Sequence, residues 1–263
     1  PRIDVIGNGA LSDARLDARL AIDPGATVKL VGARIETEFG AQLIAEGTPN
    51  NPVIFTSISD DRYGYGSTFD TKNDGSATAP RPGDWGGLYF APTSKGSLDQ
   101  AILTFGGGQT PIEGGFDNFN AIEIHQADVR IANSLIEDNA GGLSEGDRNG
   151  RATNASASIF VRGAQPIVVN NAIQNNIDAF MPVISIDVNS LNVDRQPDYG
   201  RSTGNLGRFA QFEDNRGPLI RRNRIGGNDI NAMDVRGGLL TTQSVWDDTD
   251  IVHLVRSEIA VDN

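Results

Sequence analysis

An acidic, glycine-rich segment at residues 59–82 holds the side chains best suited to bind a metal ion. Five oxygen-bearing side chains occur there: Asp60, Asp61, Asp70, Asn73 and Asp74. Carboxylate and amide oxygens presented by turns are the ligands that Ca²⁺ prefers. The spacing lacks the alternation and the distal Glu of an EF-hand loop. We therefore predict a Ca²⁺ site in this segment, with a solvated loop rich in Asx turns as the alternative.

A second acidic cluster follows Trp246 and consists of Asp247, Asp248 and Asp250. An indole beside carboxylates suits either a cation or a sugar. The alternative is a turn in which Trp246 covers apolar surface, and we favour it. The other tryptophan, Trp85, lies between glycines that permit close backbone approach, so we predict that it packs inside the protein.

Histidine and cysteine chemistry is poorly supported by the sequence. His125 and His253 are the only histidines, they lie in separate segments, and the chain has no cysteine. This composition disfavours a zinc site, and no elbow motif supports Ser-His-Asp catalysis. The triplet that starts at Asn154 fits a glycosylation acceptor, but such triplets are common by chance in an Asn-rich chain.

The charge of the chain bears on two classes of partner, nucleic acids and carbohydrate anions. The chain has 263 residues, 34 acidic and 22 basic, and a net charge of −12. An acidic chain of this kind is unsuited to nucleic acid, because neutralising phosphates supplies most of that affinity. The basic run of Arg221, Arg222 and Arg224 predicts either a contact to a carbohydrate anion or a solvated face. No apolar run reaches the roughly 18 residues that membrane insertion requires.

Three segments of the chain repeat one pattern without gaps. They are residues 131–139 (IANSLIEDN), 168–176 (VVNNAIQNN) and 220–228 (IRRNRIGGN). Each has an aliphatic residue, then Ser or Asn, then Ile, then a terminal Asn. Each unit reads as short strands closed by an Asn turn, because Asn tolerates the left-handed conformation of tight turns. A single unit cannot bury its own apolar face, so stability must come from stacking of neighbours.

Stacking predicts which residues meet. Ile136, Ile173 and Ile225 should fall on one another inside, and Asn139, Asn176 and Asn228 should meet at a corner. The predicted core is Ile136, Ile173, Ile225, Val168, Ile220, Leu103 and Ile122. Loops at 141–150 and 194–207 interrupt the units. The fold class that follows is all-β, a parallel β-helix solenoid with long loop insertions, forming one domain over 1–263. An antiparallel sandwich or a propeller is the competing architecture.

Particular motifs carry a family resemblance. Residues 47–57 (GTPNNPVIFTS), 83–88 (GDWGGL) and 235–253 resemble right-handed parallel β-helix proteins of the pectin-lyase-like class. Such β-helices occur mainly as repeat segments of large bacterial surface and secreted proteins. The resemblance implies a right-handed solenoid at the cell surface or outside the cell, and it implies that this chain is a fragment of a longer one.

The resemblance is specific for architecture and leaves function open, because this fold hosts lyases, hydrolases, adhesins and stalks. We expect a non-catalytic structural or adhesive segment, stiffened by Ca²⁺, with glycans or other surface proteins as partners and possible self-assembly through open coil ends. The alternative is a polysaccharide lyase or glycoside hydrolase acting in a groove along one parallel sheet. The Asn-Thr-Asp and Gly-His-Gly signatures of polygalacturonase-like enzymes do not occur. An enzyme should show carboxylates converging in a groove, whereas a stalk should show inward ladders.

Overall fold

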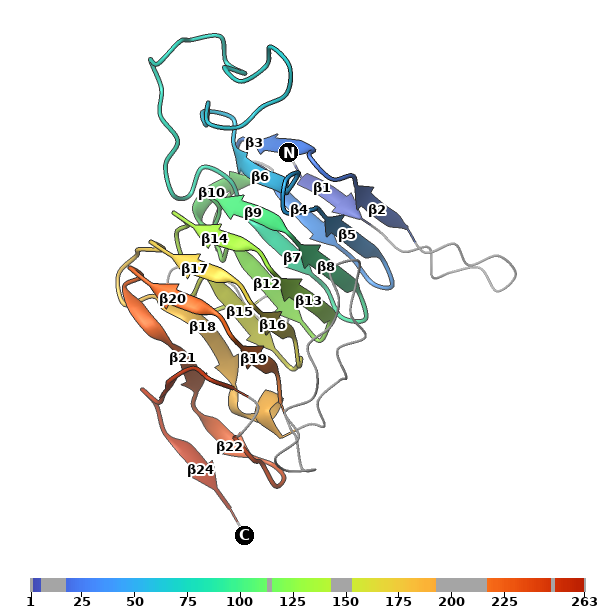
Figure 1. Ribbon diagram of the computed structural model, residues 1–263. Helices are drawn as coiled ribbons and strands as arrows, with labels where there is room; N and C mark the ends of the chain where they lie inside the picture. Colours follow the sequence, from blue (N-terminus) through green and yellow to red (C-terminus); the bar gives the residue numbers. More distant parts are fainter. Residues whose placement is uncertain are drawn as a thin grey trace, which may run out of the picture.

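The chain forms three long parallel sheets. A computed structural model describes residues 2–5, 18–112, 115–142, 153–192, 217–246 and 249–262. Successive strands along the chain enter sheet 1, sheet 2 and sheet 3 in turn, and this cycle is completed six times. The result is a stack of coils (Figure 1). The predicted all-β, solenoid-like architecture with parallel strands is confirmed.

Sheet 1 has the order β1-β4-β7-β12-β15-β18-β21-β23, sheet 2 the order β2-β5-β8-β13-β16-β19, and sheet 3 the order β3-β6-β9-β14-β17-β20. The strands of sheet 1 are β1 (Arg2–Val5), β4 (Arg34–Thr37), β7 (Leu88–Phe90), β12 (Ile122–His125), β15 (Ile159–Arg162), β18 (Pro182–Asp187), β21 (Ile230–Arg236) and β23 (His253–Leu254). Those of sheet 2 are β2 (Arg19–Ile22), β5 (Gln42–Glu46), β8 (Lys95–Asp99), β13 (Asp128–Ala132), β16 (Ile167–Val169) and β19 (Leu219–Arg221). Those of sheet 3 are β3 (Thr27–Leu30), β6 (Val53–Ser57), β9 (Ala101–Thr104), β14 (Leu135–Glu137), β17 (Ala172–Gln174) and β20 (Arg224–Gly226).

Aliphatic side chains stack in register inside the coils. In sheet 3, Leu103 pairs with Ile136, Ile136 with Ile173, and Ile173 with Ile225. Six of the seven predicted core residues are at most 2% exposed. The seventh, Ile225, is only partly buried and packs against that core. It lies on β20, the last strand of sheet 3, which has a neighbouring strand on one side only.

The predicted Asn stack is present as a hydrogen-bonded ladder. Asn139 donates its backbone N–H and its side-chain Nδ2 to Oδ1 of Asn176, both at 3.0 Å. Asn176 donates in the same way to Oδ1 of Asn228, at 3.0 and 2.9 Å. The left-handed residues of these turns are the preceding ones, Asp138 and Asn175, with φ of 54° and 56°. The expectation that the terminal Asn adopts that conformation was therefore wrong, and its amide serves the ladder instead.

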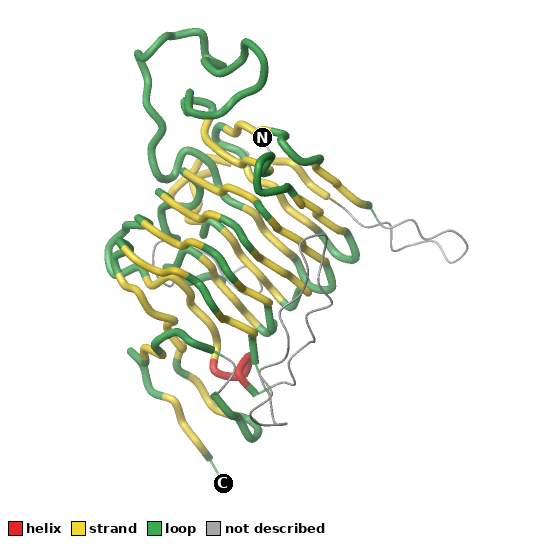
Figure 2. Tube along the Cα trace, viewed as in Figure 1, coloured by secondary structure: helices red, strands yellow, loops and turns green. Residues whose placement is uncertain are grey.

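Long insertions gather at the corner where the chain passes from sheet 3 to sheet 1. Three successive passages, at 58–87, 105–121 and 138–158, interrupt the coils there. The first projects well beyond the stack as irregular loop (Figures 1 and 2). The second contains an antiparallel hairpin of β10 (Gly108–Ile112) and β11 (Gly115–Phe119). Residues 143–150 and 194–207 of the predicted loops lie outside the described residues.

Two further elements complete the described chain. A 3-10 helix, η2 (Val188–Leu191), follows β18, and β22 (Gly238–Leu240) pairs in parallel with β24 (Ile259–Val261). Within the described part of the chain, no helix has both the length and the apolar character needed to cross a membrane.

Candidate functional site

The acidic loop brings three carboxylates together. One carboxylate oxygen each of Asp61, Asp70 and Asp74 lies within 4.8 Å of the others, so this group could hold a metal ion. Asp70 accepts hydrogen bonds from the backbone N–H of Gly75 at 2.7 Å and of Asp74 at 3.1 Å. These bonds, with that of Gly75 the strongest, hold the pKa of Asp70 below its usual value. The carboxylate is therefore ionised and available to a cation at neutral pH.

Two of the five predicted metal ligands have other roles. Asp60 is fully buried and accepts hydrogen bonds from Thr56 Oγ1 at 2.6 Å and from Arg62 Nε at 2.9 Å. Burial alone would raise the pKa of Asp60, but the bonds from Arg62 and Thr56 outweigh it and the pKa is lowered. Asn73 adopts a left-handed turn, with φ of 54°. Asp60 thus fixes the base of the loop, and Asn73 shapes its turn.

The second acidic cluster is only partly described, because Asp247 and Asp248 lie outside the described residues. Oδ2 of Asp250 accepts a hydrogen bond from the backbone N–H of Arg222 at 2.8 Å. Trp246 stacks on His253 with ring centroids 5.0 Å apart and planes 11° from parallel. Trp85 is fully buried, and its Nε1 donates to the carbonyl of Thr104 at 2.9 Å, which confirms its predicted packing role.

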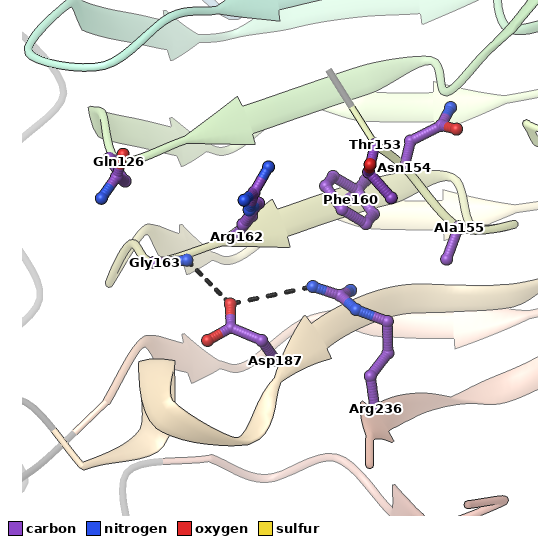
Figure 3. A pocket seen from close by; sticks show the side chains of 9 residues that line it. All are labelled: Gln126, Thr153, Asn154, Ala155, Phe160, Arg162, Gly163, Asp187 and Arg236. Carbon is purple, nitrogen blue, oxygen red and sulfur yellow. Dashed lines mark hydrogen bonds and ion pairs between the residues drawn. The ribbon is translucent and has the colours of Figure 1, made fainter. Parts of the chain in front are cut away.

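A groove on the outer face of sheet 1 gathers polar and charged side chains. Its cavity of about 460 Å³ is lined by Gln126, Thr153, Asn154, Ala155, Phe160, Arg162, Gly163, Asp187 and Arg236 (Figure 3). Strand alternation places four of these side chains outside, because the neighbouring residues Val161, Ile186 and Val235 are buried in the core. The four are Phe160, Arg162, Asp187 and Arg236. Sequence reasoning did not identify this site.

The polar groups of the groove are held in place by their surroundings. Arg236 donates to Ser185 Oγ at 2.8 Å and to the carbonyl of Val161 at 2.7 Å, and its guanidinium lies 4.3 Å from the centre of the Phe160 ring. Asp187 accepts from the backbone N–H of Gly163 at 2.7 Å and from Ser190 Oγ at 2.7 Å. A site fixed in this way needs little ordering when a ligand binds.

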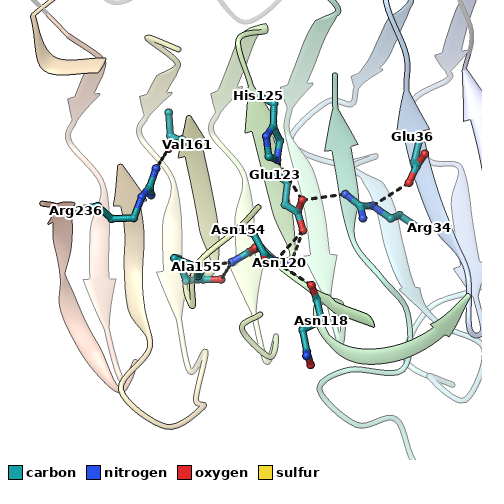
Figure 4. Close-up of polar contacts among 11 residues, drawn as sticks. Arg34, Glu36, Asn118, Asn120, Glu123, His125, Asn154, Ala155, Val161 and Arg236 are labelled. Carbon is teal, nitrogen blue, oxygen red and sulfur yellow. Dashed lines mark hydrogen bonds and ion pairs between the residues drawn. The ribbon is translucent and has the colours of Figure 1, made fainter. Parts of the chain in front are cut away.

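A buried charge network lies beside the groove on the same face of sheet 1 (Figure 4). Glu123 is fully buried, and its carboxylate accepts from Arg34 Nη2 at 3.0 Å and from the backbone N–H of Asn120 at 3.1 Å. Nε2 of His125 lies 3.3 Å from the same carboxylate. The guanidinium of Arg34 lies over the Tyr89 ring at 4.4 Å. This network orders the outer surface of three adjacent strands.

Asn154 belongs to this packed surface. It is 6% exposed, and its Nδ2 donates to the carbonyl of Asn118 and to Oδ1 of Asn120, both at 2.9 Å. In the folded protein, an amide held in this way is inaccessible to a glycosylating enzyme. The structure therefore favours a chance occurrence of the triplet at Asn154 over a glycosylation acceptor.

Comparison of the chain with protein-family models, with curated proteins and with solved structures found no match. The pectin-lyase-like resemblance of the sequence motifs therefore stays a prediction.

Proposed function

We propose that the chain is a right-handed parallel β-helix that acts as a rigid, non-catalytic adhesive element. Its ligand is an acidic glycan bound in the groove on the outer face of sheet 1. The observation that carries the proposal is the pair of guanidinium groups, Arg162 and Arg236, that line one groove on a rigid stack of coils. Acidic glycans of this kind occur outside cells, so we also propose an extracellular or cell-surface location.

The chemistry of the lining favours an anion with hydroxyl groups around it. Guanidinium groups form paired, charge-assisted hydrogen bonds with carboxylates and sulfates. Gln126 is exposed and adds an amide, while Thr153 adds a hydroxyl group. Phe160 is 2% exposed and lies against Arg236, so it supports the arginine and offers no open ring face to a sugar.

The same lining disfavours hydrolysis. Glycoside hydrolases use two carboxylic groups on either side of the scissile bond. Among the nine residues that line the groove, Asp187 is the single carboxylate, and it accepts bonds from the polypeptide. A polysaccharide lyase remains the second candidate function, because paired arginines also suit a uronate substrate.

Removal of one guanidinium should weaken glycan binding. We expect Arg162→Gln to lower the affinity for an acidic oligosaccharide by about 10- to 100-fold, because a charge-assisted hydrogen bond contributes roughly 1.5–3 kcal/mol. Isothermal titration calorimetry measures this change. The matched control is Arg19→Gln, an exposed arginine on β2 outside the groove, which should bind like the wild type.

The same titration separates the candidate functions. If wild-type protein binds none of a panel of uronate and sulfated oligosaccharides, the proposed function is wrong. If the bound glycan is shortened and unsaturated ends form, the groove is that of a lyase and the non-catalytic assignment fails.

We further propose that the ion held by Asp61, Asp70 and Asp74 is Ca²⁺ and that it stiffens the acidic loop. Millimolar Ca²⁺ should raise the melting temperature by roughly 5 °C or more over excess chelator, because a ligand present at about 100 times its Kd contributes about 2.7 kcal/mol. Asp70→Asn should abolish the shift, whereas Asp128→Asn, an exposed carboxylate on β13, should retain it. An equal melting temperature with Ca²⁺ and with chelator would contradict the proposed site, and the segment would then be a solvated loop.

A further inference from the structure

A second hollow continues the groove beyond Asp187. Its volume is about 560 Å³, and it shares Gly163 and Asp187 with the groove. The other lining residues are Gln165, Asn189, Asn192, Thr241 and Thr242. The two hollows therefore adjoin at Gly163 and Asp187, and two linked sugars would place one sugar in each.

The two hollows differ in charge. The groove has two arginines, whereas the lining of the second hollow consists of amides and hydroxyl groups apart from Asp187. Asp187, which also pairs with Arg236 of the groove at 3.7 Å, is the one charged group in the lining of the second hollow, so an acidic sugar there would find a carboxylate and no cation. A hollow that offers no cation to an acidic sugar disfavours that sugar and so provides specificity.

The amides of the second hollow are fixed for hydrogen bonding to neutral groups. Asn189 Oδ1 accepts from Asn192 Nδ2 at 2.9 Å and from Thr241 Oγ1 at 3.0 Å. Gln165 Nε2 donates to the carbonyl of Ser190 at 3.3 Å. Amides and hydroxyl groups both donate and accept, which matches the hydroxyl groups of a neutral sugar.

We infer that the ligand is an acidic heteroglycan, in which an acidic sugar in the groove is linked to a neutral sugar in the second hollow. This inference rests on the proposed function. It distinguishes the ligand from a uniform polymer of acidic sugars, which would place a charge in both hollows.

Two oligosaccharides of equal length test the inference by calorimetry. One alternates a uronic acid with a neutral hexose, and the other contains uronic acid only. We expect wild-type protein to bind the alternating compound at least about tenfold more tightly, which corresponds to about 1.4 kcal/mol. Thr242→Lys places a cation in the second hollow and should raise the affinity for the uniform compound severalfold. Gln243→Lys adds the same charge at an exposed residue outside both linings and should change that affinity little.

The outcomes separate the two levels of the proposal. If the wild-type protein binds neither compound, the proposed function itself is wrong. Equal affinity of wild-type protein for both compounds overturns the heteroglycan inference and leaves the acidic-glycan function standing. Equal effects of Thr242→Lys and Gln243→Lys also overturn the inference, because the neutral hollow would then have no part in selection.

Discussion

Ile173→Asp should strongly destabilise the protein. Ile173 is fully buried and lies between Ile136 and Ile225 in sheet 3. An aspartate there would be a carboxylate among stacked aliphatic side chains, and an unpaired buried charge is among the costliest changes a fold can undergo. We expect a loss of more than about 4 kcal/mol, a large part of the stability of a typical domain. Circular dichroism during urea denaturation measures it.

Ile177→Asp is the matched control for this substitution. Ile177 lies four residues further along the chain and is 63% exposed. The same chemical change at an exposed position should alter the free energy of unfolding by about 0.5 kcal/mol or less. If Ile173→Asp unfolds at the same midpoint urea concentration as the wild type, the register in which Ile136, Ile173 and Ile225 pair is wrong.

The coil register could be predicted from sequence because its two strongest signals, the inward aliphatic residue and the terminal Asn, lie close together in the chain. Aliphatic residues recur at one fixed distance before a terminal Asn, as for Ile136 before Asn139 and Ile173 before Asn176. Stacking then places residues at the same position of successive units together, since each coil contacts only its neighbours. Insertions do not disturb this register, because they fall in the connections between strands and leave the strands intact.

The cluster of three carboxylates was only partly predictable. The composition of the loop indicated five oxygen ligands, but composition does not show which carboxylates have a partner. Asp60 is bonded by Thr56 and Arg62, which lie four residues before it and two after it. An arginine two residues away is a visible signal that a carboxylate will form an ion pair within the protein. Attention to that neighbour would have removed Asp60 from the ligand set.

The groove could not be found by searching for motifs. Arg162, Asp187 and Arg236 come from three separate strands, and parallel pairing alone brings them side by side. They are nevertheless related by alternation, because each directly follows a buried aliphatic residue of sheet 1: Val161, Ile186 and Val235. Alignment of the sheet 1 strands by their inward residues would have placed these outward charges in one row. The repeated segments 131–139, 168–176 and 220–228 span strands of sheets 2 and 3 only, so they carry no signal for sheet 1.

Arg34→Met should destabilise the protein by about 3–5 kcal/mol, because it removes one partner of a buried ion pair. Arg34 and Glu123 lie on β4 and β12, with β7 between them, and their side chains are 2% and 0% exposed. Methionine preserves most of the packing volume against Tyr89 but withdraws the guanidinium from a carboxylate that stays buried. Urea denaturation at neutral pH measures the loss.

The double variant Arg34→Met with Glu123→Leu shows whether the cost arises from the remaining charge or from lost packing. Replacing both members of a buried pair by apolar residues is often far less costly than removing one. We therefore expect the double variant to be more stable than Arg34→Met alone, by more than about 1 kcal/mol. Some loss should remain, since the backbone N–H of Asn120 also donates to Glu123. If the losses of Arg34→Met and of Glu123→Leu, each measured alone, simply add in the double variant, Arg34 and Glu123 are not energetically coupled. The order of this outer face then comes from the aliphatic stack beneath it.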